Sequence, residues 1–281
     1  MRQRKPKNLQ ERLDAYKHLL VKAPEQHKGE WRAMFRERAA QRQNAGNAGN
    51  AEAGAGTLPQ ATLGAGTLPQ ATLGVGAMPR AALATSTLPP ATLDVEAMPP
   101  AAPEAELYLE IGAGKGRFLT AKAAAAPDSL FLGIEGRDGI VLRALEKAGA
   151  MGGANILFSR HLVRSALDIF AHGEIDGLYL NFSDPWPKPR HEAMRLTAAA
   201  RLDEYKKILK PGGFIEFKTD NKDFFEFTYR KMIEVQGYEL AEVSTSLQKS
   251  GLPARLVLTE YEERFIRWER DIYFICAIIS E

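Results

Sequence analysis

The stretch "LYLEIGAGKGRF", residues 107–118, decides the fold, because an apolar strand-like run leads through three glycines into a helical pattern. Glycines at such a turn let the backbone approach a ligand closely, and the helix that follows begins with free N–H groups. The alternation of short apolar runs and helical patterns continues from there to the C-terminus. It predicts strands at 107–111, 130–135, 155–158, 176–182, 214–218, 238–244 and 271–279, and helices at 117–126, 138–150, 163–171, 198–209 and 222–236. We therefore expect an α/β fold with a doubly wound, mostly parallel, seven-stranded Rossmann-like sheet, whose ligands bind beyond the carboxyl ends of the strands.

Acidic residues surround the glycine turn. Glu110 precedes it on the first strand, and Glu135 ends the second strand, where a carboxylate can accept hydrogen bonds from both hydroxyls of a ribose. The glycine spacing is G-x-G-x-G rather than the dinucleotide pattern G-x-G-x-x-G, and the order of a phosphate-binding P-loop is also absent. Acidic groups suit a cationic ligand better than a pyrophosphate, so the pattern favours S-adenosylmethionine, which carries a sulfonium and an ammonium group. We expect Gly112, Gly114 and Gly116 to line its site.

The amino-acid composition indicates the cellular compartment in which the protein is expected. The chain of 281 residues has one cysteine, Cys276, which excludes an internal disulfide framework and fits a reducing cytoplasm. The sequence contains no run of 18 apolar residues, and its first residues lack the apolar segment of a signal peptide. We expect a cytoplasmic protein without a membrane-spanning segment. No metal site is predicted, and the oligomeric state stays open between monomer and homodimer.

Charge and repeats divide the chain into three parts. Residues 1–43 carry 12 Lys and Arg against 5 Asp and Glu and show helical spacing, which predicts a basic helical arm. Such an arm indicates a polyanionic partner or a merely solvated basic helix. Residues 44–104 contain the decamer "GAGTLPQATL" twice, at 54–63 and 64–73, followed by decaying copies, and we expect a disordered insert there. The remaining part, 105–281, is the expected α/β domain.

The stretch "NFSDPWPKPRH", residues 181–191, follows a predicted buried strand. It could be only a stiff turn in which Asp184 caps a helix that starts with Pro185. That interpretation leaves Trp186, Lys188, Arg190 and His191 without a reason. A rigid acid followed by a phosphate-binding group explains all of them.

These motifs resemble those of the bacterial tRNA (guanine-N7-)-methyltransferases. "LEIGAGKGRF", "GIE", "YLNFSDPWPKPRH", "RLT", "KPGG", "FKTDN" and "TEYEERF" occur in the order typical of that family, over residues 107–281. The resemblance implies a class I methyltransferase fold. It also implies transfer of a methyl group from S-adenosylmethionine to N7 of a guanine in the variable loop of tRNA.

The resemblance also implies roles for single residues. Glu110, Glu135 and Asp184 would contact the cofactor, and Asp184 would be the catalytic acid that also contacts the guanine. The tRNA would be held by Lys188, Asp220, Thr259, Glu260, Tyr261 and Glu262. Simpler interpretations stay open for three positions: Glu110 as a strand-end carboxylate paired with an arginine, Asp220 as an Asx-turn residue, and Thr259 as a helix cap.

The sequence departs from the family pattern in three places. Leu162 stands at the cofactor-binding position where the family has an acid or amide that reads the adenine amine. Pro189, Ala193 and Met194 stand where cations are usual, and the decamer insert has no counterpart. Leu162 and the loss of cations at 189, 193 and 194 favour the alternative of a catalytically weak relative that binds RNA, whereas the glycine spacing disfavours a nicotinamide oxidoreductase.

Overall fold

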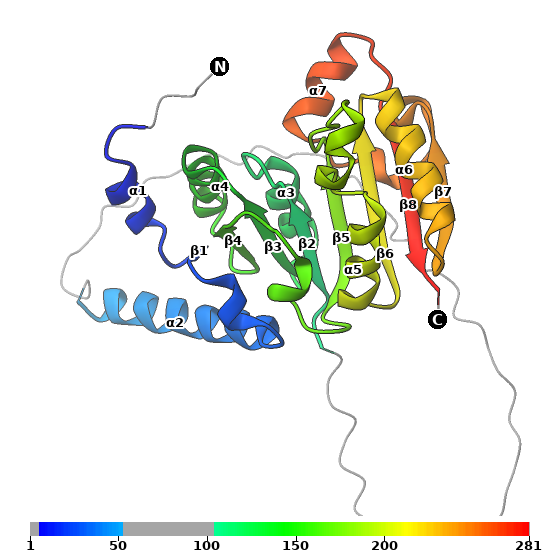
Figure 1. Ribbon diagram of the computed structural model, residues 1–281. Helices are drawn as coiled ribbons and strands as arrows, with labels where there is room; N and C mark the ends of the chain where they lie inside the picture. The colour runs from blue at the N-terminus through cyan, green and yellow to red at the C-terminus, as the bar shows by residue number, and fades with distance from the viewer. Residues whose placement is uncertain (1–5, 53–103, 281) are drawn as a thin grey trace, which may run out of the picture. The chain divides into compact units, whose positions relative to one another are not determined.

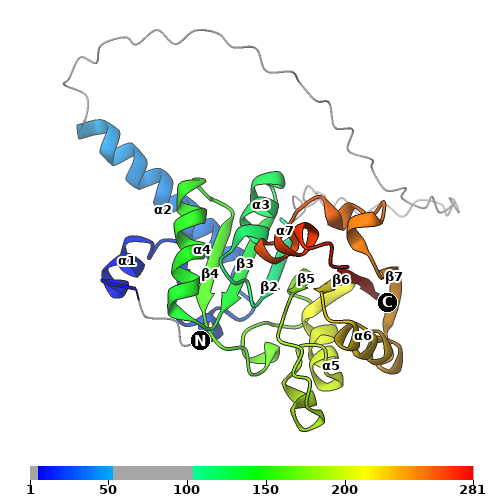
Figure 2. The same cartoon turned by 90° about the horizontal axis from the view of Figure 1, so that it is seen from above.

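The computed structural model of the chain describes residues 6–52 and 104–280. The described residues up to Ala45 and from Ala105 onward form one compact unit, in which helices cover both faces of a central sheet (Figures 1 and 2). Its strands are β1 (Leu20–Val21), β2 (Leu107–Ile111), β3 (Leu130–Glu135), β4 (Ile156–Arg160), β5 (Ile175–Asn181), β6 (Leu209–Thr219), β7 (Tyr238–Ser244) and β8 (Tyr273–Ile279). The α-helices are α1 (Leu9–Ala15), α2 (Trp31–Glu52), α3 (Arg117–Ala125), α4 (Asp138–Ala150), α5 (Ala199–Ile208), α6 (Lys222–Glu234) and α7 (Glu260–Arg267).

The strands lie in the order β1-β4-β3-β2-β5-β6-β8-β7. All neighbours from β1 to β6 pair in parallel, and β8 is antiparallel to both β6 and β7. The order reverses between β2 and β5, so the chain has a switch point there, where open α/β sheets bind ligands. The predicted doubly wound, mostly parallel sheet is confirmed, with one strand more than expected.

The additional strand, β1, comes from the N-terminal arm. Leu20 and Val21 pair in parallel with Phe158 and Ser159 at the edge of the sheet. The backbone N–H of Phe158 donates to the carbonyl of Leu19, and the Ser159 hydroxyl donates to the carbonyl of Val21. A strand of two residues has too short a pattern to be recognised in the sequence.

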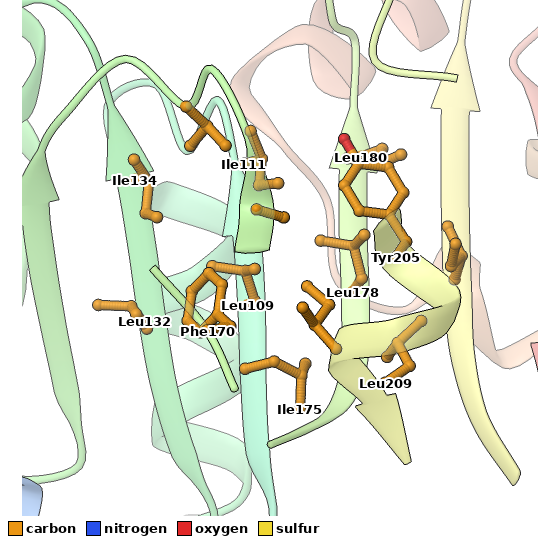
Figure 3. Packing of buried hydrophobic residues seen from close by; sticks show 14 of the residues in the cluster. Leu109, Ile111, Leu132, Ile134, Phe170, Ile175, Leu178, Leu180, Tyr205 and Leu209 are labelled. Atoms are coloured by element: carbon orange, nitrogen blue, oxygen red, sulfur yellow. The ribbon is translucent and has the colours of Figure 1, made fainter. Parts of the chain in front are cut away.

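Two apolar layers enclose the sheet. On one face, β2, β3 and β5 pack against α5 and α6 through a large cluster, part of which Figure 3 shows from Leu109 and Leu178 to Tyr205. Trp31 of α2 is fully buried in the same cluster. On the opposite face, α1, α3 and α4 pack on the sheet through a second cluster that includes Phe118 and Phe158. Figure 2 shows α3 and α4 on one side of the sheet and α5 and α6 on the other.

Some sequence predictions differ from the structure. The predicted helix at 163–171 is wrong: only a 3-10 turn, Ala166–Asp168, forms there, and the Ser165 hydroxyl accepts a hydrogen bond from the N–H of Leu167 at its start. The strand predicted at 155–158 extends instead from Ile156 to Arg160. The decamers lie outside the described residues, so the three-part division of the chain stays a prediction. Within 6–52 and 104–280, no helix is both long and apolar enough to cross a membrane.

Candidate active site

The predicted site residues lie along one edge of the sheet. Glu110 is the fourth residue of β2, Glu135 ends β3, and Asp184 and Asp220 follow β5 and β6. These strands are parallel neighbours, so their carboxyl ends meet at this edge. Helix α7 lies at the same edge, beyond the ends of β5 and β6 (Figure 1).

The glycine turn after β2 depends on its glycines. Gly112, Gly114 and Gly116 all have positive φ, at 81°, 55° and 74°. A Cβ on Gly116 would lie 2.6 Å from the Cβ of Ala144, so only glycine allows α3 to pack this closely on α4. The N–H of Gly112 donates to the carbonyl of Ile134, which holds the turn against the end of β3. Within the turn Gly112 is exposed and Gly114 half-buried, whereas Gly116 is buried under α4.

Glu110 and its neighbours form a buried polar group between β2 and β5. The Asn181 side-chain amide donates a hydrogen bond of 2.8 Å to Oε1 of Glu110. The second carboxylate oxygen, Oε2, has no partner among the described residues, and the same holds for Asn181 Oδ1 and Ser183 Oγ. Buried acceptors without partners are costly, so three of them in this one place suit a ligand that supplies the missing donors. Sequence reasoning missed Asn181 and Ser183, although both lie in the quoted stretch that follows β5.

Burial changes the chemistry of Glu110. Desolvation raises the pKa of Glu110 to about 8, although the hydrogen bond from Asn181 and the charge of Lys218 act in the opposite direction. Among the contacts that the structure describes, no arginine pairs with Glu110. The interpretation of Glu110 as an arginine-paired carboxylate at a strand end is therefore wrong. A cationic ligand would favour the ionised form and restore an ordinary carboxylate.

Glu135 organises the turn from the neighbouring strand. Its Oε2 accepts a 3.2 Å hydrogen bond from the N–H of Gly114, and its Oε1 accepts from the N–H of Arg137 at 3.0 Å. The Arg137 guanidinium also donates to Oε1, through Nε at 3.2 Å. A carboxylate has about four acceptor positions, so one position is left for a further hydroxyl donor. Leu162, beyond the end of β4, is 71% exposed, and a Cβ on Gly136 would lie 3.7 Å from its Cδ1. Position 162 is therefore next to the Glu135 end of β3.

The loop after β5 has an unusual backbone. Phe182 and Trp186, which flank Asp184, both have left-handed φ values of 51° and 41°, which are rare for residues with large side chains. Such conformations cost roughly 1–3 kcal/mol each and persist only where the surroundings hold them. Asp184 itself is exposed. An exposed acid is thus presented from a rigid and strained loop.

Arg195 holds this loop in place, and sequence reasoning missed it. Its guanidinium donates to the carbonyl of Pro185 at 2.9 Å and to the carbonyl of Trp186 at 3.0 Å. The same group lies over the ring of Phe227 on α6, 4.1 Å from the ring centroid. Arg195 belongs to the "RLT" motif, which in the sequence indicates the family resemblance and no role for this residue.

The "TEYE" stretch begins α7. Thr259 and Glu262 form a capping box, in which the Thr259 hydroxyl accepts from the N–H of Glu262 and the Glu262 carboxylate accepts from the N–H of Thr259. The interpretation of Thr259 as a helix cap is therefore confirmed. Glu262 also accepts a hydrogen bond of 3.1 Å from Lys218 of β6, and the two side chains are 1% and 0% exposed. Glu260 pairs with Lys147 of α4, and only Tyr261 of the four is an exposed side chain.

The other predicted tRNA contacts lie around the same edge. Asp220 is partly exposed, and its carboxylate lies 3.9 Å from the guanidinium of Arg270. The neighbouring Asn221, not Asp220, caps α6. Lys188 is exposed directly before the 3-10 turn Pro189–Met194. The structure thus places every predicted site residue near one edge, while two of the six expected tRNA contacts, Thr259 and Glu262, have buried side chains engaged within the protein.

Comparison with known proteins gives two kinds of similarity. The family described as putative methyltransferase matches residues 104–275. A tRNA (guanine-N(7)-)-methyltransferase of Lachnoclostridium phytofermentans is 41% identical over 171 residues, 61% of this chain and 79% of that protein. The enzyme of the same name from Streptococcus suis is 43% identical over 61% of this chain and 80% of its own length. A solved SAM dependent methyltransferase from Aquifex aeolicus is 14% identical, with a TM-score of 0.45 over 63% of this chain and 84% of that one.

Proposed function

The chain belongs to the family of the bacterial tRNA (guanine-N(7)-)-methyltransferases, and from this premise we propose that it methylates N7 of a guanine in the variable loop of tRNA with S-adenosylmethionine. The observation that carries the proposal is the group of buried acceptors, Glu110, Asn181 and Ser183, beside the rigid loop of Asp184. Because the substrate would be tRNA, we also propose that the protein acts in the cytoplasm.

The residues at the switch point fit S-adenosylmethionine. The ligand carries an ammonium group and hydroxyls that can donate to the unpartnered oxygens of Glu110, Asn181 and Ser183, and its positive charge suits the carboxylates of Glu110 and Glu135. A Cβ on Gly112 would have no neighbour within 4 Å, so a ligand can approach the backbone of the turn at this position. When bound, this ligand supplies an electrophilic methyl group on a sulfonium centre.

Asp184 has the role of an electrostatic group in this proposal. Guanine N7 already carries a lone pair in the plane of the base, so the protein does not have to generate a nucleophile by deprotonation. Its main task is to hold N7 in line with the methyl group, which is a matter of proximity and orientation. Asp184 would accept a hydrogen bond from the edge of the guanine as positive charge develops on the ring, and so stabilise the transition state. The fixed loop means that this group needs no reorganisation during the reaction.

Cationic and polar groups around the edge would hold the tRNA. Lys188 and Arg190 are exposed on the turn after the loop, and they can contact phosphates. Asp220, Glu260 and the exposed Tyr261 would complete the proposed contact region, and the buried side chains of Thr259 and Glu262 would hold the start of α7 in place. Phosphate contacts of Lys188 and Arg190 would position the RNA without reading its sequence.

Replacing Asp184 tests the proposal. Asp184→Ala should lower turnover on unmodified tRNA by on the order of 100-fold or more, as does the loss of a preorganised electrostatic group. The fold should persist because the side chain is exposed. Transfer of labelled methyl from S-adenosylmethionine to tRNA measures the effect.

Asp203→Ala is the matched control, because Asp203 is an exposed acid on α5 whose one ion pair among the described residues is with nearby Lys206. The control should turn over like the wild type. Equal turnover of Asp184→Ala and Asp203→Ala would remove Asp184 from the mechanism and leave its loop as a stiff turn.

A further inference from the structure

Helix α7 and the residue after it carry aromatic rings on one exposed face. Tyr261, Arg264, Phe265 and Trp268 recur at intervals of three and four residues, which places them on the same side of the helix. Tyr261 is 49% and Trp268 56% exposed, whereas Phe265 is buried and anchors the face to the body of the protein. We call Tyr261, Arg264, Trp268 and Arg270 the α7 surface.

The aromatic rings form a continuous series that starts in the Asp184 loop. Phe182, two residues before Asp184, stacks on Tyr261 with ring centroids 5.8 Å apart. Tyr261 stacks on Phe265 at 6.3 Å, and Phe265 meets Trp268 edge to face at 6.1 Å. The α7 surface is therefore continuous with the proposed catalytic edge.

Guanidinium groups accompany the exposed rings. Arg264 lies 5.9 Å from the Tyr261 centroid and 5.6 Å from that of Trp268, and Arg270 lies 5.8 Å from the Trp268 centroid. In the part of the chain that the structure describes, no acid lies within salt-bridge distance of Arg264, and Arg270 reaches only Asp220, at 3.9 Å. One exposed acid, Glu269, follows Trp268.

The acids of the first turn of α7 pair with cations of the domain. Glu260 pairs with Lys147 of α4, and Glu263 pairs with Arg117 of α3. Glu262 is buried against Lys218. The acidic start of the helix thus holds α7 on the domain, and the face that continues toward Trp268 is left with exposed rings and cations.

We propose that the α7 surface binds an unpaired nucleotide of the tRNA next to the target guanine, with the base stacked on Trp268 and its phosphate held by Arg264 and Arg270. The proposal rests on the proposed function and names a further part of its substrate site. Exposed aromatic rings beside guanidinium groups have the chemistry that stacks unpaired bases and neutralises their phosphates. An apolar protein partner would not need two exposed guanidinium groups over the rings, and continuity with Phe182 places the surface next to the reacting base.

Substitutions at Trp268 test the proposal in the full chain. Trp268→Ala should raise the KM for unmodified tRNA by about 5- to 150-fold, which corresponds to the loss of one stacked base. It should leave kcat at saturating tRNA and the Kd for S-adenosylmethionine unchanged. Trp268→Phe should behave nearly as the wild type, because a ring that can stack is retained. Arg264→Ala should lower the slope of log Kd against log salt by roughly 0.7.

Ile233→Ala is the matched control, since Ile233 on α6 is an equally exposed apolar side chain, 58% exposed, and should leave the KM unchanged. The proposal is overturned if Trp268→Ala has the same KM as Ile233→Ala, or if it alters the Kd for S-adenosylmethionine as much as that for tRNA, which would indicate a structural role. Direct titration with tRNA separates this inference from the proposed function. A wild type that binds tRNA more tightly than Trp268→Ala supports the surface even if no methyl transfer is found.

Discussion

At the scale of single residues, the raised pKa of Glu110 leads to a testable prediction. Burial raises this pKa to about 8, so most Glu110 side chains are protonated at pH 7.0. A bound cation favours the carboxylate, and binding of S-adenosylmethionine at pH 7.0 should therefore release about one proton from Glu110. Calorimetric titrations in buffers of different ionisation enthalpy measure this number.

Glu110→Gln is the control for proton release, because a glutamine keeps the size of the side chain and cannot titrate. It should bind more weakly and release about one proton fewer. The same pKa affects stability: because the folded value lies above the ordinary 4.5, stability from the protonated group is present below about pH 4.5 and is lost as the pH rises through 8. Equal proton release by both proteins would contradict the account of Glu110.

A second prediction at this scale concerns Leu162 and the binding of S-adenosylmethionine. A leucine cannot accept a hydrogen bond from the adenine amine, and its side chain is largely exposed beside the end of β3. Leu162→Asp should tighten S-adenosylmethionine binding by roughly 5- to 150-fold, since an unmade hydrogen bond typically costs about 1–3 kcal/mol. Calorimetry on both proteins at one pH checks this. If Leu162→Asp binds no better, another group already reads the adenine.

At the scale of elements, Arg195 connects the Asp184 loop to α6. Arg195→Ala would release the carbonyls of Pro185 and Trp186, and the left-handed residues could relax. We expect kcat on tRNA to fall by about 100-fold, as small misplacements of a catalytic group do, while the Kd for S-adenosylmethionine changes little.

Arg195→Lys should recover part of the lost kcat, because a lysine can donate to one of the two carbonyls. If the substitutions only destabilised the fold, the melting temperatures of both variants would fall. The kcat on tRNA and the Kd for S-adenosylmethionine would then worsen together. An unchanged kcat in Arg195→Ala would show that the loop does not depend on this residue.

Elements with strong local patterns were predictable, and long-range contacts were not. Helix α4 matches its predicted range, 138–150, because its apolar spacing and length are unambiguous. The helix predicted at 163–171 fails because Ser165 caps a short 3-10 turn instead. The carboxylates and glycines of the site could be found in sequence. The Lys218–Glu262 pair could not, because its residues are 44 positions apart along the chain, and the Arg195 contacts could not, because they depend on how the loop 9 to 10 residues before it folds back.

At the scale of the whole molecule, the arm and the insert differ in what they contribute. Trp31 is fully buried, its N–H donates to Glu174, and its indole N–H donates to the carbonyl of Ile169. Arg32 pairs with Asp176 at the start of β5. The arm is therefore part of the folded core, beyond its basic composition, and its contact with RNA stays a prediction.

Two deletions test this difference. Removing 1–43 should prevent folding, because it removes β1 and a buried tryptophan, whose loss alone typically costs about 3–5 kcal/mol. Removing 53–103 should preserve the melting temperature, since a Pro, Gly and Ala repeat contributes little burial. Thermal unfolding of the two proteins measures both effects. A stable protein without the arm, or an unfolded one without the insert, would contradict the corresponding expectation.

The central claim is methyl transfer to guanine N7, and chemical location of the methyl group tests it most directly. Unmodified tRNA is incubated with the protein and S-adenosylmethionine, and is then treated with borohydride and aniline, which cleave the chain at N7-methylguanine. The account predicts a single cleavage in the variable loop, which is absent with Asp184→Ala. Incorporated methyl without cleavage, or no methyl incorporated by a protein that binds both S-adenosylmethionine and tRNA, would contradict it.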